Sequence, residues 1–131
     1  MLLPWGLATM RSTLLLLATD PDLLIDIASA ARDAGYRVAP GRHHELGIDA
    51  LTRTQARIAL VHVMHEAAAA LTFAGLAEQL GTQVVLFARR DASPEERARV
   101  VTVSAVVTAP VLEYAGAAAL IHEMEQRRPA D

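Results

Sequence analysis

Four of the five histidines fall into two short clusters, and imidazole is a common metal ligand. The first cluster is His43-His44-Glu45, and the second is His62 with His65-Glu66. His62 and His65 are separated as zinc ligands can be, and a loop could bring His43 or His44 toward them. However, a histidine that closes a buried strand more often has an ordinary structural role, and paired histidines in a polar loop are usually solvated. A metal or small-ligand site at these histidines is therefore the alternative hypothesis.

The acidic residues near the start of the chain lie in the stretch LLLLATDPDLL. Asp20 is followed by Pro21, and an aspartate before a proline is a typical N-cap and first turn of a helix. We favour this role for Asp20 over metal binding. Acids also open a second helix, in SPEE, and they would repel a phosphate group from both helix starts.

The sequence does not support catalysis. A Ser-His-Asp set can be named from Ser104, His62 and Asp20, but nothing in the sequence places the three together. No glycine-rich phosphate-binding motif is present. All 12 basic residues are arginine, so a mechanism that needs a lysine is closed. We expect a non-enzymatic protein without a cofactor.

Composition favours one folded domain. The chain has 131 residues, of which 53% are hydrophobic and 21% charged. Its formal net charge of −3 argues against nucleic-acid binding. The run LLLL is too short to span a membrane, and the lack of cysteine fits a cytoplasmic location. We expect residues 1–11 to be a disordered leader and 12–131 to be a single domain.

Strand and helix patterns alternate along the rest of the chain. Continuous apolar runs predict buried parallel strands, and apolar residues at helical spacing, with caps at the ends, predict the helices. The expected strands are 14–17, 36–39, 57–63, 83–88 and 105–108, and the expected helices are 21–34, 48–54, 67–80, 93–102 and 111–126. Five alternating strands and helices predict a doubly wound α/β fold with a five-stranded parallel sheet.

Five segments in this order resemble the receiver domain of two-component response regulators: LLLLATDPDLL, DAGYRV, IALVHVMH, VVLFAR and VVTAPV. The resemblance covers nearly the whole chain from Ser12 on. It implies a flavodoxin-like fold with strand order 2-1-3-4-5. It also implies that the Ala109–Pro110 peptide bond is cis, as the corresponding bond in receivers usually is.

The residues that receivers use for phosphorylation do not match. The resemblance places Ala18 and Thr19 at the paired acids (or Asp20, if the segment is shifted by one residue), and His62 at the aspartate nucleophile. Phe87 falls at the hydroxyl position and Ala109 at the lysine. The fifth strand has no aromatic residue in this alignment, so the usual coupling between strands is also missing. The chain therefore resembles a pseudo-receiver that acts independently of phosphorylation.

In receivers the face formed by the fourth helix, the fifth strand and the fifth helix commonly binds partners. The resemblance implies that this face forms a homodimer or docks to a signalling partner. The residues that we expect at such an interface are Arg97, Arg99, Val106, Val111, Glu113 and Tyr114. An ordinary solvated surface explains the same residues on sequence alone.

Overall fold

The structure, a computed structural model, describes residues 13–18, 20–41, 44–62, 67–107 and 109–127. The leader expected at residues 1–11 lies outside this range. The strands are β1 (Thr13–Leu17), β2 (Arg37–Gly41), β3 (Ile58–His62), β4 (Gln83–Arg89) and β5 (Val111–Tyr114). The helices are α2 (Pro21–Asp33), α3 (His44–Thr54), α4 (Ala67–Gln79), α5 (Pro94–Val107) and α6 (Ala117–Gln126).

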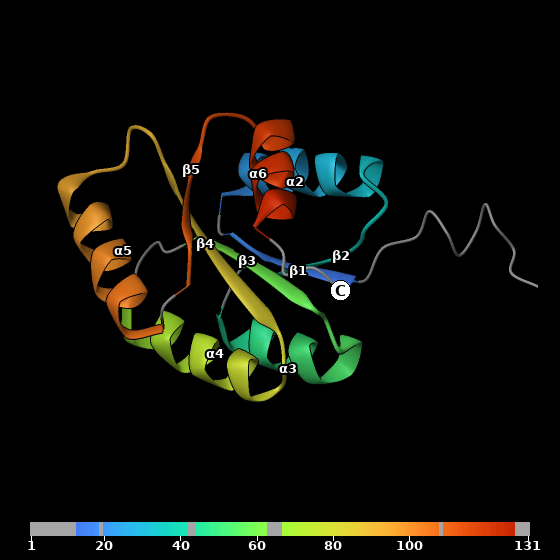
Figure 1. The fold of residues 1–131 in the computed structure, drawn as a ribbon, viewed down its shortest axis with the longest axis horizontal. Coiled ribbons are helices and arrows are strands. Elements are labelled where there is room, and N and C mark those ends of the chain that lie inside the picture. Colours follow the sequence, from blue (N-terminus) through green and yellow to red (C-terminus); the bar gives the residue numbers. More distant parts are fainter. Residues whose placement is uncertain (1–12, 19, 42–43, 63–66, 108, 128–131) are drawn as a thin grey trace, which may run out of the picture.

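The five strands form one parallel sheet in the order β2-β1-β3-β4-β5, which confirms the predicted topology. Helices α2 and α6 cover one face, and α3, α4 and α5 lie on the other (Figure 1). The leucine run of β1 serves both layers, because successive side chains of a strand point to opposite faces. Leu14 and Leu16 pack under α2 and α6, while Leu15 and Leu17 join the other core.

The strand β2 extends further than the sequence suggested. Pro40 and Gly41, expected in a loop, pair with Leu16 and Leu17 of β1. Pro40 is tolerated there because β2 lies at the edge of the sheet, where a missing N–H breaks no second ladder. None of the helices in the described part of the chain is long and apolar enough to cross a membrane.

The boundaries expected near the carboxyl terminus are wrong. Residues 105–107, expected in the fifth strand, belong to α5, and the strand itself begins at Val111, where a helix was expected. Although β-branched residues favour strands, the helix buries Val100 and Val103 on one face against the sheet. Tertiary packing thus overrides the local preference of this valine-rich run.

The proline that precedes β5 was also misinterpreted. Pro110 lies before the last strand, and its carbonyl accepts a hydrogen bond from the Leu86 N–H at 2.9 Å. The predicted cis Ala109–Pro110 bond is wrong, since the described residues include no cis peptide bond. The turn from β5 into α6 falls instead at Gly116, whose φ of 141° suits glycine.

Candidate functional site

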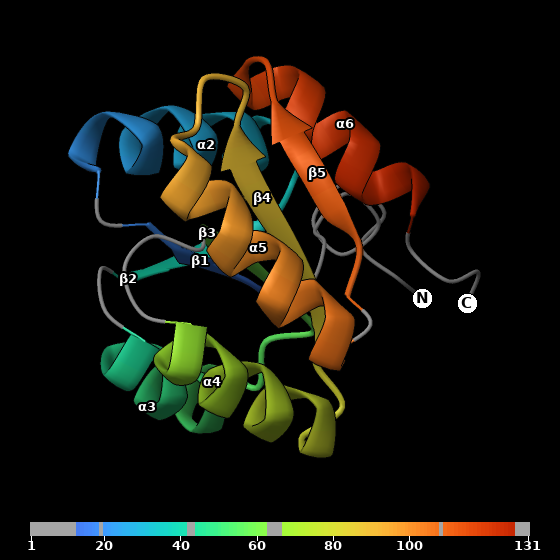
Figure 2. The same cartoon turned by 90° about the vertical axis from the view of Figure 1, so that its left-hand side faces the viewer.

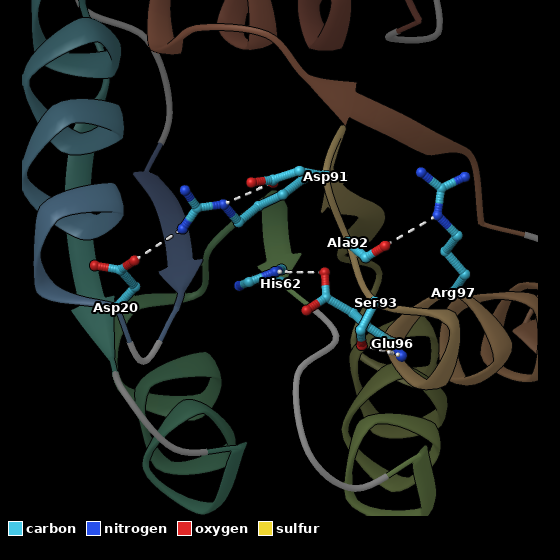
Figure 3. Close-up of polar contacts among 8 residues, drawn as sticks. Asp20, His62, Asp91, Ala92, Ser93, Glu96 and Arg97 are labelled. Carbon is cyan, nitrogen blue, oxygen red and sulfur yellow. Dashed lines mark hydrogen bonds and ion pairs between the residues drawn. The ribbon is translucent and has the colours of Figure 1, made fainter.

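The carboxyl edge of the sheet brings together side chains from several elements. Asp20 follows β1, His62 ends β3, and Arg89 and Tyr114 end β4 and β5. Since the strand order reverses between β1 and β3, Asp20 and His62 flank the point at which open α/β sheets usually bind ligands. Figure 3 shows these two residues on opposite sides of the edge, with Glu96 approaching His62 from α5.

His62 is buried, with 4% of its surface exposed. Its imidazole stacks on the ring of Phe87, with ring centroids 5.0 Å apart and planes inclined by 18°. Nε2 lies 3.4 Å from the Glu96 Oε2. Nδ1 has no hydrogen-bond partner in the described part of the chain. Burial lowers the pKa of His62, and the neighbouring carboxylate of Glu96 opposes this effect in part.

Glu96 comes from the first turn of α5, which opens with Ser93-Pro94-Glu95-Glu96. This is the pattern of a capping box, in which the serine and the glutamate each bond the other's backbone N–H. One half of that box is present, because the Glu96 N–H donates to the Ser93 Oγ at 3.1 Å. The Glu96 carboxylate contacts His62 instead of completing the second half. The start of α5 is thereby connected to the end of β3.

Asp20 caps α2 as predicted. Its Oδ1 accepts a hydrogen bond from the Asp22 N–H at 2.9 Å. Its Oδ2 pairs with the Arg89 Nη1 at 3.1 Å, and the Arg89 Nε lies 3.4 Å from the Asp91 Oδ1. Both carboxylate oxygens of Asp20 are thus engaged. Arg89 was not among the expected site residues, although its place at the end of a predicted strand was a signal.

The residues assigned to the phosphoacceptor pocket are only partly brought together. Ala18, His62 and Phe87 are buried at the carboxyl edge, while Thr19 lies outside the described residues. The assignment of Ala109 to the lysine position requires a correction. Ala109 precedes β5, so it lies at the opposite end of that strand, and Tyr114 stands at its carboxyl end.

The fifth strand also carries an aromatic residue, contrary to expectation. The ring of Tyr114 is tilted by 45° against that of Phe87, with centroids 6.3 Å apart. His62, Phe87 and Tyr114 therefore form a continuous row of rings across three neighbouring strands.

The histidines of the metal hypothesis receive little support. His43 and His65 lie outside the described residues, and His44 is the first residue of α3. In the segments that the structure describes, no group of three or more histidines and acids could hold a metal ion. The Nε2 of His62 is occupied by Glu96.

A second surface lies between α5 and the edge strand β5. Figure 2 shows α5 crossing in front of β4, with β5 beside it at the end of the sheet. A groove of about 390 Å³ runs along this surface. Its lining is mostly apolar and includes Ala88, Arg89, Arg97, Val100, Val101, Val111, Leu112 and Glu113.

Exposed apolar side chains gather around this groove. The described residues include five exposed large hydrophobic side chains, and three of them belong to α5 or β5: Val101 (65% exposed), Val106 (67%) and Val111 (39%). Val106 was expected on a strand but lies on α5. Exposed apolar residues on one face are a feature that protein-interaction surfaces share.

The charged residues of this surface make contacts within the chain. The Arg90 Nε donates to the Glu113 Oε1 at 2.8 Å. Arg97 donates to the carbonyl oxygens of Ala92 and Arg90, at 3.2 and 2.8 Å. Arg99 is half-buried, and its Nε has no partner in the described part of the chain.

Comparison with solved structures identifies the fold as receiver-like. The chemotaxis protein CheY4 of Vibrio cholerae matches with a TM-score of 0.70 and 15% identity over 89% of this chain and 98% of that one. The signal receiver domain of a modulated diguanylate cyclase from Desulfovibrio desulfuricans matches with a TM-score of 0.67 and 18% identity, over 87% and 90%.

These similarities establish the fold alone. A de novo designed Rossmann 2x3 protein matches equally well, with a TM-score of 0.68 and 12% identity over 92% of this chain and 94% of that one. No family model matches the chain, and no protein of curated function does. Function must therefore be argued from the side chains.

Proposed function

We propose that this chain is a receiver-like signalling module that works independently of phosphorylation and acts through protein contacts. The observation that carries this proposal is the composition of the carboxyl edge. His62 ends β3, where a receiver has its aspartate, and it is stacked on Phe87 and bound to Glu96. Phosphoryl transfer to an aspartate needs that nucleophile, carboxylates that hold a metal ion and a cationic countercharge. His62 is not a carboxylate, and Arg89, the cation that ends β4, is already paired with Asp20 and Asp91.

The neighbouring side chains support the same interpretation. Ala18 is buried and apolar, and Asp20, the one acid described between β1 and α2, is engaged by the Asp22 N–H and by Arg89. The chain contains no lysine. In this proposal the protein has no catalytic role and no cofactor, and it works in the cytoplasm.

A phosphodonor assay tests this part of the proposal. The protein is incubated with acetyl phosphate and magnesium, and its intact mass is measured beside that of a receiver domain with the usual aspartate. We expect the receiver to gain a phosphoryl group and this protein to keep its mass. A stable phosphorylated product would contradict the proposal. An acid-labile product that disappears in His62→Gln would contradict it as well.

The surface that we propose for protein contacts is the α5–β5 face, defined by the groove residues together with Val106 and the Arg90–Glu113 pair. Its apolar centre can supply affinity, while its charged residues fix orientation. In the described part of the chain Arg97 takes part in no ion pair, and Glu113 is more than half exposed. One face thus carries both a cation and an acid.

We infer that the occupant of this face is a second copy of the chain. A two-fold axis would bring each Arg97 toward the Glu113 of the other copy and would cover the exposed valines of both, because both copies present the same patch. Docking of a different signalling protein is the other outcome of the test. Sedimentation of the wild type and of a variant of this face decides between the two occupants.

The alternative, a metal- or small-ligand-binding domain, is less well supported. The described histidines and acids form no cluster of metal-binding size, and His62 already contacts Glu96. Metal analysis of the purified protein tests this alternative. Stoichiometric zinc that remains after dialysis would favour it over the proposal.

A further inference from the structure

His62 is the one titratable side chain in the described part of the chain that is almost completely buried at the carboxyl edge. It contacts two neighbouring elements at once. Phe87 of β4 packs against its face, and Glu96 of α5 lies 3.4 Å from its Nε2. A residue in this position connects the centre of the sheet to the start of α5.

The contacts specify a neutral imidazole with one particular tautomer. Since the Glu96 carboxylate accepts, we assign the proton to Nε2, which leaves a lone pair on Nδ1. Nδ1 is buried without a partner in the described residues. A second proton would create a buried N–H donor that lacks an acceptor, which is costly.

Charged groups from three elements face this imidazole. Glu96 of α5 and Asp20, before α2, favour the protonated form, whereas burial and Arg89 of β4 oppose it. Arg89 is itself held between Asp20 and Asp91. Burial has the largest effect, and the net result is a lowered pKa for His62.

We propose that the His62–Glu96 contact is an acid-sensitive latch, which holds the first turn of α5 against the carboxyl edge at neutral pH and releases it when His62 is protonated. Because no described residue offers an acceptor to Nδ1, the protonated ring would have to leave the buried stack with Phe87 to satisfy its second N–H among the described groups or in solvent. Because Nε2 moves with the ring, Glu96 then loses its contact with β3. The start of α5 is left with its Ser93 cap and the hydrogen bonds of Arg97.

Release of the latch would reach the α5–β5 face. Arg97, Val100 and Val101 lie within the five residues that follow Glu96 on α5, and they line the groove. A shift of the first turn would therefore change the width of the groove beside β5. This regulatory consequence rests on the proposed function, whereas the latch itself does not, because it is a property of the isolated chain.

Nuclear magnetic resonance of the whole chain tests the latch directly. The protein is titrated from about pH 8 to about pH 5, a range that covers ordinary histidine titration, while the His62 ring protons and the amides of residues 94–101 are followed. We expect His62 to titrate below the ordinary value of about 6.5. The amides at the start of α5 should shift with the same midpoint.

Two variants and one control separate a latch from general acid sensitivity. In His62→Phe, which retains an aromatic stack, the α5 amides should no longer respond in this range. In Glu96→Gln the fold should be retained and His62 should titrate at a lower pH, because the carboxylate that favours its protonated form is gone. The midpoint of the α5 amides should move down with it. In His122→Gln, which removes an exposed histidine of α6, the titration should match that of the wild type.

Two results would overturn the latch. One is that the chemical shifts of the α5 amides stay constant while His62 titrates, or change only as the whole protein unfolds. The other is an α5 response whose midpoint is the same in Glu96→Gln as in the wild type. Neither readout requires a dimer or a partner. Failure of the latch is therefore distinguishable from failure of the proposed α5–β5 face.

Discussion

The imidazole of His62 lies almost flat on the ring of Phe87, with 18° between the two planes. The two residues are paired across β3 and β4, so the stack follows from the sheet register. It fills with rings the two positions that the proposed function assigns to the aspartate and the hydroxyl group of a receiver. Tyr114 extends the row to the edge strand.

The lowered pKa of His62 predicts that stability falls on mild acidification. The unfolded chain takes up a proton near the ordinary histidine value of about 6.5, whereas the folded chain takes it up only at lower pH. The contribution of the neutral His62 to stability is therefore fully present above the pKa of the unfolded chain. It is lost as the pH falls from there toward the pKa of the folded chain. Urea midpoints measured on both sides of this range should decrease on acidification. The decrease of the urea midpoint should become smaller in His62→Phe. If the midpoint of this variant falls with pH as steeply as that of the wild type, other groups cause the loss of stability.

The two roles of Asp20 can be separated by two substitutions. Asp20→Ala removes the α2 cap and the contact with Arg89, and should destabilise the protein by about 1 kcal/mol. Asp20→Asn keeps an effective cap and loses only a half-exposed ion pair, so its cost should be below about 1 kcal/mol. Urea unfolding of the two variants measures the difference. Equal losses would mean that the pair with Arg89, rather than the cap, matters most.

The burial of α5 makes a prediction about two of its valines. Val103 is fully buried, and Val106 is 67% exposed. Val103→Ala should cost about 2 kcal/mol of unfolding free energy, while Val106→Ala should be nearly neutral. Equilibrium unfolding in urea provides both values. A larger loss for Val106→Ala would contradict the burial of these two side chains.

The apolar runs of the sequence predict the parallel sheet, because strands that are buried on both faces are continuous apolar runs. The resemblance to receivers supplies the strand order, which the structure confirms. The secondary structure predicted from the sequence is wrong between Val100 and Pro110. There, β-branched residues favour a strand locally, and only the burial of Val100 and Val103 against the sheet reveals the helix. Because the last strand was predicted at 105–108 instead of Val111–Tyr114, Ala109 was assigned to the lysine position at the wrong end of the strand.

The carboxyl edge is less predictable than the fold. Its strand ends follow from the topology, and the Asp20 cap follows from the proline beside it. The contact between His62 and Glu96 joins residues 34 positions apart, and it replaces a local hydrogen bond that the capping motif favours. No local sequence pattern predicts that the Glu96 carboxylate contacts His62 instead of the Ser93 N–H. The role of Arg89 likewise depends on the loop that brings Asp91 back to it.

The central claim, that the protein acts through contacts made by the α5–β5 face, is tested most directly by sedimentation of the wild type and two matched variants. Val101→Asp places a charge on the proposed face, at a residue that is 65% exposed. Ile25→Asp makes a comparable change on α2, at a residue that is 64% exposed. Neither side chain is buried, so both variants should fold, and circular dichroism verifies this.

At micromolar concentration we expect a dimer for the wild type and for Ile25→Asp, and a folded monomer for Val101→Asp. The expected loss reflects the cost of burying an unpaired charge in an apolar interface. A dimer that survives Val101→Asp would contradict the assignment of this face. A wild-type protein that remains monomeric at every concentration would contradict self-association itself.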